Sequence, residues 1–149
     1  MRAEDLQKKV YSLDYSDARV MEVTSQYFGD ELIIRFGDCN NDRKIDESYF
    51  FSGCRSINLR NEDIGEAGPL RNYDFRRLAF IGQDINVREV TYQTEYLIKR
   101  EQLEKEIYAV NFYEFDMNIT ALHITIVCKG IRVEDENGKV LLEAEVDRL

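Results

Sequence analysis

Apolar and polar side chains alternate along the last thirty residues of the chain. Between residues 121 and 134, one side of an extended chain carries Leu122, Ile124, Ile126 and Cys128. This period of two predicts a strand, and Gly130 within it predicts a bulge. A second alternating segment at residues 140–146 follows Asn137 and Gly138, a pair that favours a two-residue type I′ turn. We therefore expect a β-hairpin at this end of the chain.

A short helix and several strands are predicted in the rest of the chain. Leu6, Val10 and Leu13 recur at spacings of four and three, which places them on one helical face of residues 4–13. Short apolar runs between polar turns predict strands at residues 18–24, 31–36, 48–53, 56–59, 84–93 and 107–116. The run at 56–59 is either a strand of its own or a continuation of its predecessor past a glycine bulge.

The connecting segments complete the expected architecture. Residues 37–46 are polar and predict a hairpin loop, and residues 60–75 predict the longest loop, with a helical turn at 71–78. Residues 95–106 combine charged residues that favour helix with Tyr, Leu and Ile that favour strand. We expect one domain, mostly β with α+β left open. Its form would be an antiparallel curved sheet, a partial barrel or a two-layer sandwich with a short N-terminal helix.

The chain is strongly acidic, with a net charge of −9. This charge repels phosphate backbones and anionic lipid, so we expect no nucleic-acid partner and no membrane binding. No apolar stretch approaches the ~18 residues that a membrane span needs. Residues 101–149 carry 11 acidic and 5 basic side chains. They form either a solubilising surface or an acidic face for a basic protein partner.

The three cysteines do not form a recognisable framework. Cys39, Cys54 and Cys128 are odd in number and show no C-x-x-C spacing, so neither a disulfide set nor a metal site is indicated. Cys128 lies in an apolar run and is predicted to be buried. The first fifteen residues are too polar for a signal peptide. A reducing cytoplasm is the expected compartment, and no cofactor is predicted.

One loop carries oxygen ligands at calcium-binding spacing. These are Asp38, Asn40, Asp42 and Asp46, and they follow the start of an EF-hand or dockerin loop. Arg43 stands where that loop needs Gly, and Tyr49 stands where it needs a bidentate Glu. A solvated hairpin loop explains the same residues, because Asn and Asp tolerate turn conformations.

Candidate catalytic groups are few. His123 is the only histidine and lies on the polar side of its predicted strand. Glu114 with Asp116, and Glu143 with Glu145, are spaced two apart, so each pair shares a strand face. Such pairs serve acid/base chemistry when one pKa is raised, but they are also typical of a half-exposed strand.

Aromatic residues cluster near the predicted strands. The cluster comprises Tyr49, Phe50, Phe51, Tyr108, Phe112, Tyr113 and Phe115. Core packing or a protein-binding patch explains it better than nucleic-acid stacking, because its surroundings are acidic. As partner-contact candidates we single out Tyr113, Glu114, Asp116, Glu143 and Glu145.

Two segments, MEVTSQYFGDELIIRFGD and LHITIVCKGIRVEDENGK, resemble small bacterial proteins of unknown function. Some of those proteins are encoded beside polymorphic toxins and are suspected immunity proteins. The resemblance covers residues 18–36 and 121–139 and implies a protein-binding module that inhibits a basic toxin. It carries over no functional residues. Two alternatives remain: a structural subunit or homodimer, and a small carboxylate-dependent hydrolase or ligand-binding barrel.

Overall fold

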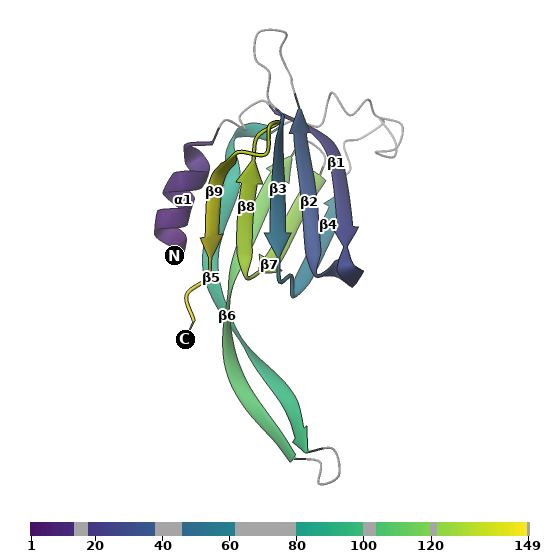
Figure 1. The fold of residues 1–149 in the computed structure, drawn as a ribbon, viewed down its shortest axis with the longest axis vertical. Coiled ribbons are helices and arrows are strands. Elements are labelled where there is room, and N and C mark those ends of the chain that lie inside the picture. Colours follow the sequence, from purple (N-terminus) through teal and green to yellow (C-terminus); the bar gives the residue numbers. More distant parts are fainter. Residues whose placement is uncertain (14–17, 38–45, 62–79, 100–103, 120–121, 149) are drawn as a thin grey trace.

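The computed structural model describes residues 1–13, 18–37, 46–61, 80–99, 104–119 and 122–148. Within them the chain forms one α-helix, α1 (Ala3–Tyr11), and two antiparallel sheets (Figure 1). The five-stranded sheet has the order β1 (Arg19–Gln26), β2 (Glu31–Gly37), β3 (Glu47–Ser52), β8 (Gly130–Glu134), β9 (Val140–Glu145). The four-stranded sheet has the order β4 (Ser56–Asn61), β7 (Leu122–Cys128), β6 (Glu104–Ile119), β5 (Phe80–Lys99).

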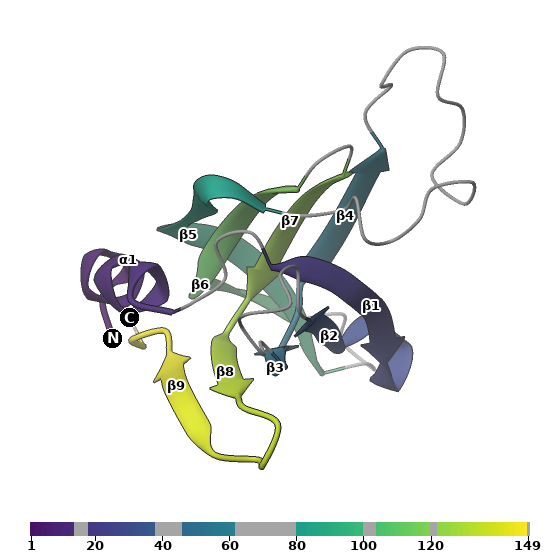
Figure 2. The same ribbon diagram turned by 90° about the horizontal axis from the view of Figure 1, so that it is seen from above.

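The two sheets lie face to face as the layers of a sandwich (Figures 1 and 2). The prediction of a mostly β fold with antiparallel sheets and a short N-terminal helix is thus confirmed, and the two-layer alternative is the one adopted. The ambiguous residues around 95–106 are strand where they are described, since β5 reaches Lys99 and β6 starts at Glu104. The helical turn expected at 71–78 lies outside the described residues.

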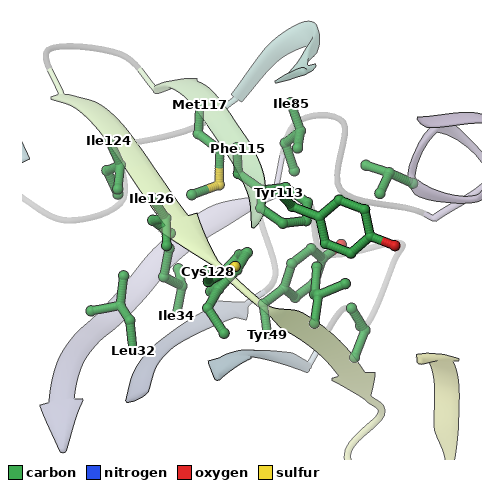
Figure 3. Packing of buried hydrophobic residues seen from close by; sticks show 14 of the residues in the cluster. Leu32, Ile34, Tyr49, Ile85, Tyr113, Phe115, Met117, Ile124, Ile126 and Cys128 are labelled. Carbon is green, nitrogen blue, oxygen red and sulfur yellow. The ribbon is translucent and has the colours of Figure 1, made fainter. Parts of the chain in front are cut away.

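Alternating side chains of both sheets fill the space between them. Figure 3 shows the centre of this core, in which Tyr113, Phe115 and Met117 of β6 meet residues of β2 and β3. The rings of Phe51 and Phe115 join the layers edge to face, with centroids 5.1 Å apart. Cys128 is fully buried, as its sequence context predicted. The aromatic cluster is therefore mostly core, although Phe50 and Tyr108 lie outside it.

The single strand expected over residues 121–134 is two strands in different sheets. β7 ends at Cys128, and β8 begins at Gly130 after the chain has crossed between the layers at Lys129. The Lys129 amide donates to the Ser52 carbonyl at 3.0 Å, which ties the crossing to the end of β3. The core-facing positions change from even to odd numbers at the crossing, since Ile126 and Cys128 precede it and Ile131 and Val133 follow it. The break in the alternation at Gly130 therefore comes from the change of sheet. The prediction of a bulge within one strand was wrong for this reason.

The predicted hairpin at Asn137 and Gly138 is present, but its turn is of another type. β8 and β9 are antiparallel neighbours, whereas Gly138 is the only residue of the turn with a positive φ, 79°. The Gly138 amide donates to the Asp135 carbonyl at 3.1 Å, and the Asp135 carboxylate accepts from the amides of Asn137 and Lys139. This is a type I turn followed by a glycine bulge. The Asp135 side chain therefore favours a three-residue loop over the predicted type I′ turn.

Helix α1 covers one lateral edge of the sandwich. Leu6 and Val10 are fully buried, as the helical spacing predicted. The Gln7 amide bonds to the backbone of β5 twice: Nε2 donates to the Ile85 carbonyl at 2.8 Å, and the Val87 amide donates to Oε1 at 2.7 Å. The glutamine thus takes the place of a neighbouring strand at this edge.

Candidate functional site

The outer face of the five-stranded sheet carries a shallow groove of about 590 Å³. Two cross-strand rows form it, because residues paired across antiparallel strands point to the same side. The first row is Glu31, Ser52, Gly130 and Glu145, and the second is Ile33, Phe50, Arg132 and Glu143. We call this surface the sheet groove. Its residues come from two pairs of consecutive strands, β2–β3 and β8–β9, which are far apart in the sequence.

Gly130 keeps the floor of the sheet groove low. A Cβ atom at this position would lie 3.1 Å from Ser52 Oγ and 3.2 Å from the Ala144 carbonyl oxygen. Both distances are tighter than ordinary van der Waals contact, so a larger side chain would displace its neighbours. The glycine expected to mark a bulge therefore allows the hollow instead.

The sheet groove has an apolar centre and acidic ends. Ile33 and Phe50 are paired and half-buried, and the Arg132 guanidinium lies 4.7 Å from the centroid of the Phe50 ring. Arg132 is paired with Glu134 at 3.0 Å, which neutralises the cation. Among the described residues, none forms an ion pair with the carboxylates that line the groove: Glu31, Glu143 and Glu145. Negative charge thus remains available at both ends.

An exposed aromatic tip borders the sheet groove. Tyr27 and Phe28 form the turn between β1 and β2 together with Gly29, and all three have positive φ angles of 51°, 57° and 92°. Tyr27 is 70% exposed, and Phe28 is fully exposed. Aromatic residues rarely adopt left-handed backbone conformations, and their persistence at a solvent-exposed turn is typical of functional sites. We call these two residues the aromatic tip.

A second hollow, of about 610 Å³, lies on the other side of the aromatic tip. It is bounded by the β1–β2 turn and by β4, where Leu59 is 51% exposed. Cys54 lines it, and burial raises the pKa of this thiol to about 11. The thiol is therefore protonated at neutral pH and is a poor nucleophile. Tyr27 lines both hollows, so the tip is accessible from two sides.

The sequence-predicted contact residues separate into three environments. Glu143 and Glu145 lie in the sheet groove. Glu114 and Asp116 lie on the outer face of the four-stranded sheet, where Glu114 is paired with Arg88 at 2.8 Å. Tyr113 faces the core and is fully buried, so its side chain is not available to contact a partner. The aromatic tip was missed, although Gly29 and Asp30, a pair typical of turns, lie between the predicted strands at 18–24 and 31–36.

His123 takes part in a surface network with both ring nitrogens engaged. Its Nε2 bonds to the Asp116 carboxylate, which also accepts from the Thr125 hydroxyl at 3.3 Å. Arg60 Nη2 lies 2.7 Å from Nδ1, so the arginine donates and Nδ1 is the acceptor. With Nδ1 already bonded to a cation, the imidazole has no free nitrogen with which to accept a proton from a substrate.

The predicted calcium loop falls mostly outside the described residues. This holds for Asp38, Asn40 and Asp42, whereas Asp46 pairs with Arg35 at 3.2 Å. In the part of the chain that the structure describes, no cluster of three acidic, histidine or cysteine side chains is suited to a metal ion. A calcium titration followed by thermal melting tests the loop.

Among the described helices none is long and apolar enough to cross a bilayer.

The family model for immunity protein PIM7 matches residues 2–135. The chain belongs to this family. The resemblance to immunity proteins drawn from two segments is thereby confirmed over most of the chain. No curated protein matches it. The match includes α1 and the strands β1–β8, whereas β9, with Glu143 and Glu145, follows the matched residues. Membership of the PIM7 family supports a role in binding a protein toxin rather than in catalysis.

Proposed function

We propose that this immunity protein neutralises its toxin by holding a basic surface of that toxin in the sheet groove, with the aromatic tip as a second contact. The observation that carries the proposal is the combination of Phe50 at the centre with the carboxylates of Glu31, Glu143 and Glu145 around it, which form no ion pair with any described residue. Protein interfaces combine an apolar, aromatic centre with a polar rim in this way.

The electrostatics of the groove favour a cationic partner. The carboxylates at its ends have no ion partner among the described residues, so a toxin lysine or arginine would pair with them without breaking an existing ion pair. The chain as a whole carries −9, which speeds encounter with a positively charged protein. We expect affinity of nanomolar class at low salt, and we expect it to weaken as ionic strength rises.

The spacing of the carboxylates indicates what shape would fit. Glu31 on β2 and Glu145 on β9 are the ends of one cross-strand row. They are separated by three interstrand steps of about 4.8 Å, or roughly 14 Å. An α-helix with its side chains is about 10–12 Å wide. A helix or loop with basic side chains on both flanks therefore matches the groove.

The test uses the toxin that this protein neutralises, to be sought among the genes beside its own, and two arginine substitutions. Ser52→Arg places a bulky cation on the floor of the groove, because Ser52 is exposed between Glu31 and Gly130. Asn58→Arg is the matched control: it is an exposed strand residue on the outer face of the other sheet. Calorimetry measures the affinity of each variant for the purified toxin, and circular dichroism checks its fold.

We expect Ser52→Arg to lower affinity at least about tenfold, since juxtaposed like charges cost several kcal/mol at an interface. Asn58→Arg should bind as the wild type does. Unchanged binding by Ser52→Arg would place the toxin elsewhere on the molecule, and a loss by Asn58→Arg alone would point to the four-stranded sheet. An affinity that does not depend on salt would remove the electrostatic part of the proposal.

A further inference from the structure

Strand β6 continues well past the sandwich. It runs over Glu104–Ile119, but β7 pairs only with residues 113–119. Of the strands that the structure describes, only β5 pairs with residues 104–112. We call residues 90–99 and 104–112 the arm. It is a two-stranded ribbon that projects beyond both sheets (Figure 1).

The arm leaves the sandwich at the same end as the sheet groove. Its root is the position where Tyr113 pairs with Cys128, the last residue of β7. Gly130, on the floor of the groove, follows two residues later and pairs with Glu145, the last residue of β9. A partner that extends from the groove around this end of the five-stranded sheet therefore reaches the arm.

One face of the arm continues the core-facing side of the four-stranded sheet. Side chains two apart on a strand share a face, and β6 pairs with β5 in one unbroken register from residue 107 to residue 117. Tyr113, which is fully buried, therefore shares its face with Asn111, Ala109 and Ile107. We call the face that carries these last three residues the inner face of the arm.

The cover over this face ends step by step along β6. The five-stranded sheet covers Tyr113, whose hydroxyl donates to the Glu145 carbonyl at 2.8 Å. The Asn111 amide donates to the Asp147 carbonyl at 3.4 Å, so the segment after β9 covers that position. Ile107 lies beyond it and is 67% exposed. The face that buries aromatic residues inside the sandwich thus presents an aliphatic residue to solvent on the arm.

The uncovered part of the inner face has the size of one further element. An isolated two-stranded ribbon is only marginally stable in water, and packing of another element against its apolar side stabilises it. Ile107 lies about 13 Å past Asn111 along the strand. An α-helix with its side chains is about 10–12 Å wide. One helix or loop of a partner therefore fits on this face beside the end of the sandwich.

The root of the arm adds two cations to this surface. A hollow of about 390 Å³ lies between residues 109–111, Lys129 and residues 145–148. Lys129 and Arg148 line it, and neither forms an ion pair with a described residue. The Lys129 ammonium lies 5.7 Å from the centroid of the Phe112 ring, which restrains it. The hollow therefore offers positive charge to an acidic group of a partner.

Glu145 joins the root of the arm to the sheet groove, because it lines both hollows. Asp147, the other carboxylate at the root, is already paired with the N-terminal ammonium at 2.7 Å. The two surfaces are thus continuous, and one partner can occupy both. A toxin suits them better than a second copy does, since two chains of net charge −9 repel each other whereas the groove favours a cationic protein.

We propose that the toxin held in the sheet groove extends around the end of the five-stranded sheet onto the inner face of the arm. There Ile107 contacts an apolar toxin side chain, and Lys129 and Arg148 pair with an acidic one. This contact rests on the proposed function, because it requires a toxin already bound in the groove. The toxin surface then needs cations for the groove and an acidic group for the arm, which selects one toxin among other basic proteins.

Ile107→Asp tests the apolar contact. Ile107 is mostly exposed, so circular dichroism should show an intact fold. Calorimetry should show an affinity for the purified toxin that is at least about tenfold lower, because a desolvated charge replaces an apolar contact. Val140→Asp is the matched control and should bind as the wild type does. Val140 is a 45% exposed strand residue that pairs with Glu134 at the opposite end of the sandwich.

Arg148→Glu tests the charged contact, and its expected effect is opposite to that of net charge. The substitution makes the chain more acidic, so it would not weaken binding to a basic toxin that touched the groove alone. We expect instead an affinity at least about tenfold lower, because like charges then meet at the root of the arm. Lys139→Glu makes the same change of charge in the β8–β9 turn and should not lower the affinity.

Hydrogen exchange of the wild-type protein provides a readout that needs no substitution. The amides of residues 107–111 that point away from β5 should exchange more slowly when the toxin is bound. Unchanged exchange at these amides would overturn the arm contact. Wild-type affinity in either Ile107→Asp or Arg148→Glu would overturn it as well.

Ser52→Arg separates the arm contact from the groove itself. If Ser52→Arg lowers the affinity and Ile107→Asp does not, the groove holds the toxin and the arm contact is overturned. If Ile107→Asp alone lowers it, the proposed function fails at the groove, and so does a toxin that spans both surfaces. If sedimentation shows that Ile107→Asp dissociates a wild-type dimer while toxin affinity stays the same, the arm binds a second copy instead. Losses in both variants support the contact.

Discussion

The guanidinium carbon of Arg132 on β8 lies 4.7 Å from the centroid of the Phe50 ring on β3, its direct cross-strand neighbour. The cation is held there by an ion pair with Glu134 at 3.0 Å. A cation over an aromatic face restrains both side chains. The centre of the sheet groove is therefore pre-organised for a partner, which lowers the entropy cost of binding.

Phe50→Ala should weaken toxin binding while leaving the fold intact. Phe50 is half-buried on the outer face, so its loss removes an interface anchor rather than core packing. Hot-spot aromatics contribute about 2 kcal/mol or more, or roughly a thirtyfold loss of affinity. Phe51→Ala is the control, since Phe51 is fully buried and its truncation should cost about 3–5 kcal/mol of unfolding free energy. Calorimetry and urea unfolding separate the two effects. Wild-type affinity in Phe50→Ala would contradict the proposed site.

Glu143→Lys should slow association with the toxin. Its carboxylate lies at an end of the groove without an ion partner among the described residues, so reversal places a cation where a toxin cation is expected. We expect the association rate to fall about tenfold at low salt and the difference to shrink as salt rises. Stopped-flow measurements would show this. Glu136→Lys makes the same change of net charge in the β8–β9 turn and should have little effect. Equal effects of both variants would mean that only net charge matters.

Phe28→Gly should raise stability and lower affinity at once. Phe28 has a φ of 57°, and a left-handed backbone costs a non-glycine residue about 1–2 kcal/mol. Glycine removes that cost but adds disorder to the unfolded chain, so a net gain of about 0.5 kcal/mol is expected. Phe28→Ala loses the ring and keeps the strained backbone, so it should weaken binding without the gain. Denaturant unfolding and calorimetry measure both quantities. A Phe28→Gly protein that binds like the wild type would exclude the aromatic tip from the interface.

Glu47→Gln should stabilise the protein at neutral pH. Burial raises the pKa of Glu47 above its ordinary 4.5; the hydrogen bond from the Tyr49 hydroxyl opposes this rise, and nearby Asp135 adds to it. A raised folded-state pKa means that the stabilising contribution is present below the ordinary pKa and is lost as pH rises through the folded value. The advantage of Gln should therefore appear at neutral pH and vanish in acid. Thermal melting across pH checks this, with Glu145→Gln on the outer face as the control. A constant difference across pH would contradict it.

Much of the fold could be predicted because strand and helix periodicities are local properties. Leu6 and Val10 on α1, and Ile124 and Ile126 on β7, are buried as their spacing indicated. The errors arose where local pattern and tertiary contacts diverge. The break in alternation at Gly130 predicted a bulge, because local sequence does not reveal that β7 and β8 face one core from two layers. The type of turn at Asn137 was decided by the Asp135 carboxylate. This carboxylate accepts hydrogen bonds from the backbone amides of Asn137 and Lys139, which stabilises the three-residue loop.

The candidate site could be predicted only in part. Glu143 and Glu145 were singled out because their spacing placed them on one strand face, and they do lie together in the sheet groove. Tyr113 was singled out as an aromatic residue, but the direction of its side chain depends on which face of β6 meets the second sheet. The aromatic tip was overlooked because nothing in its composition reveals a left-handed backbone.

The sequence by itself determined the acidity of the chain, its strands and the side chains that alternate toward a core, since each follows from neighbouring residues. The tertiary structure alone decided which strands are neighbours. Ile33, Phe50, Arg132 and Glu143 form one row although about a hundred residues separate the first from the last. Pairing between distant strands depends on the packing of the whole sandwich, and local periodicity does not encode it.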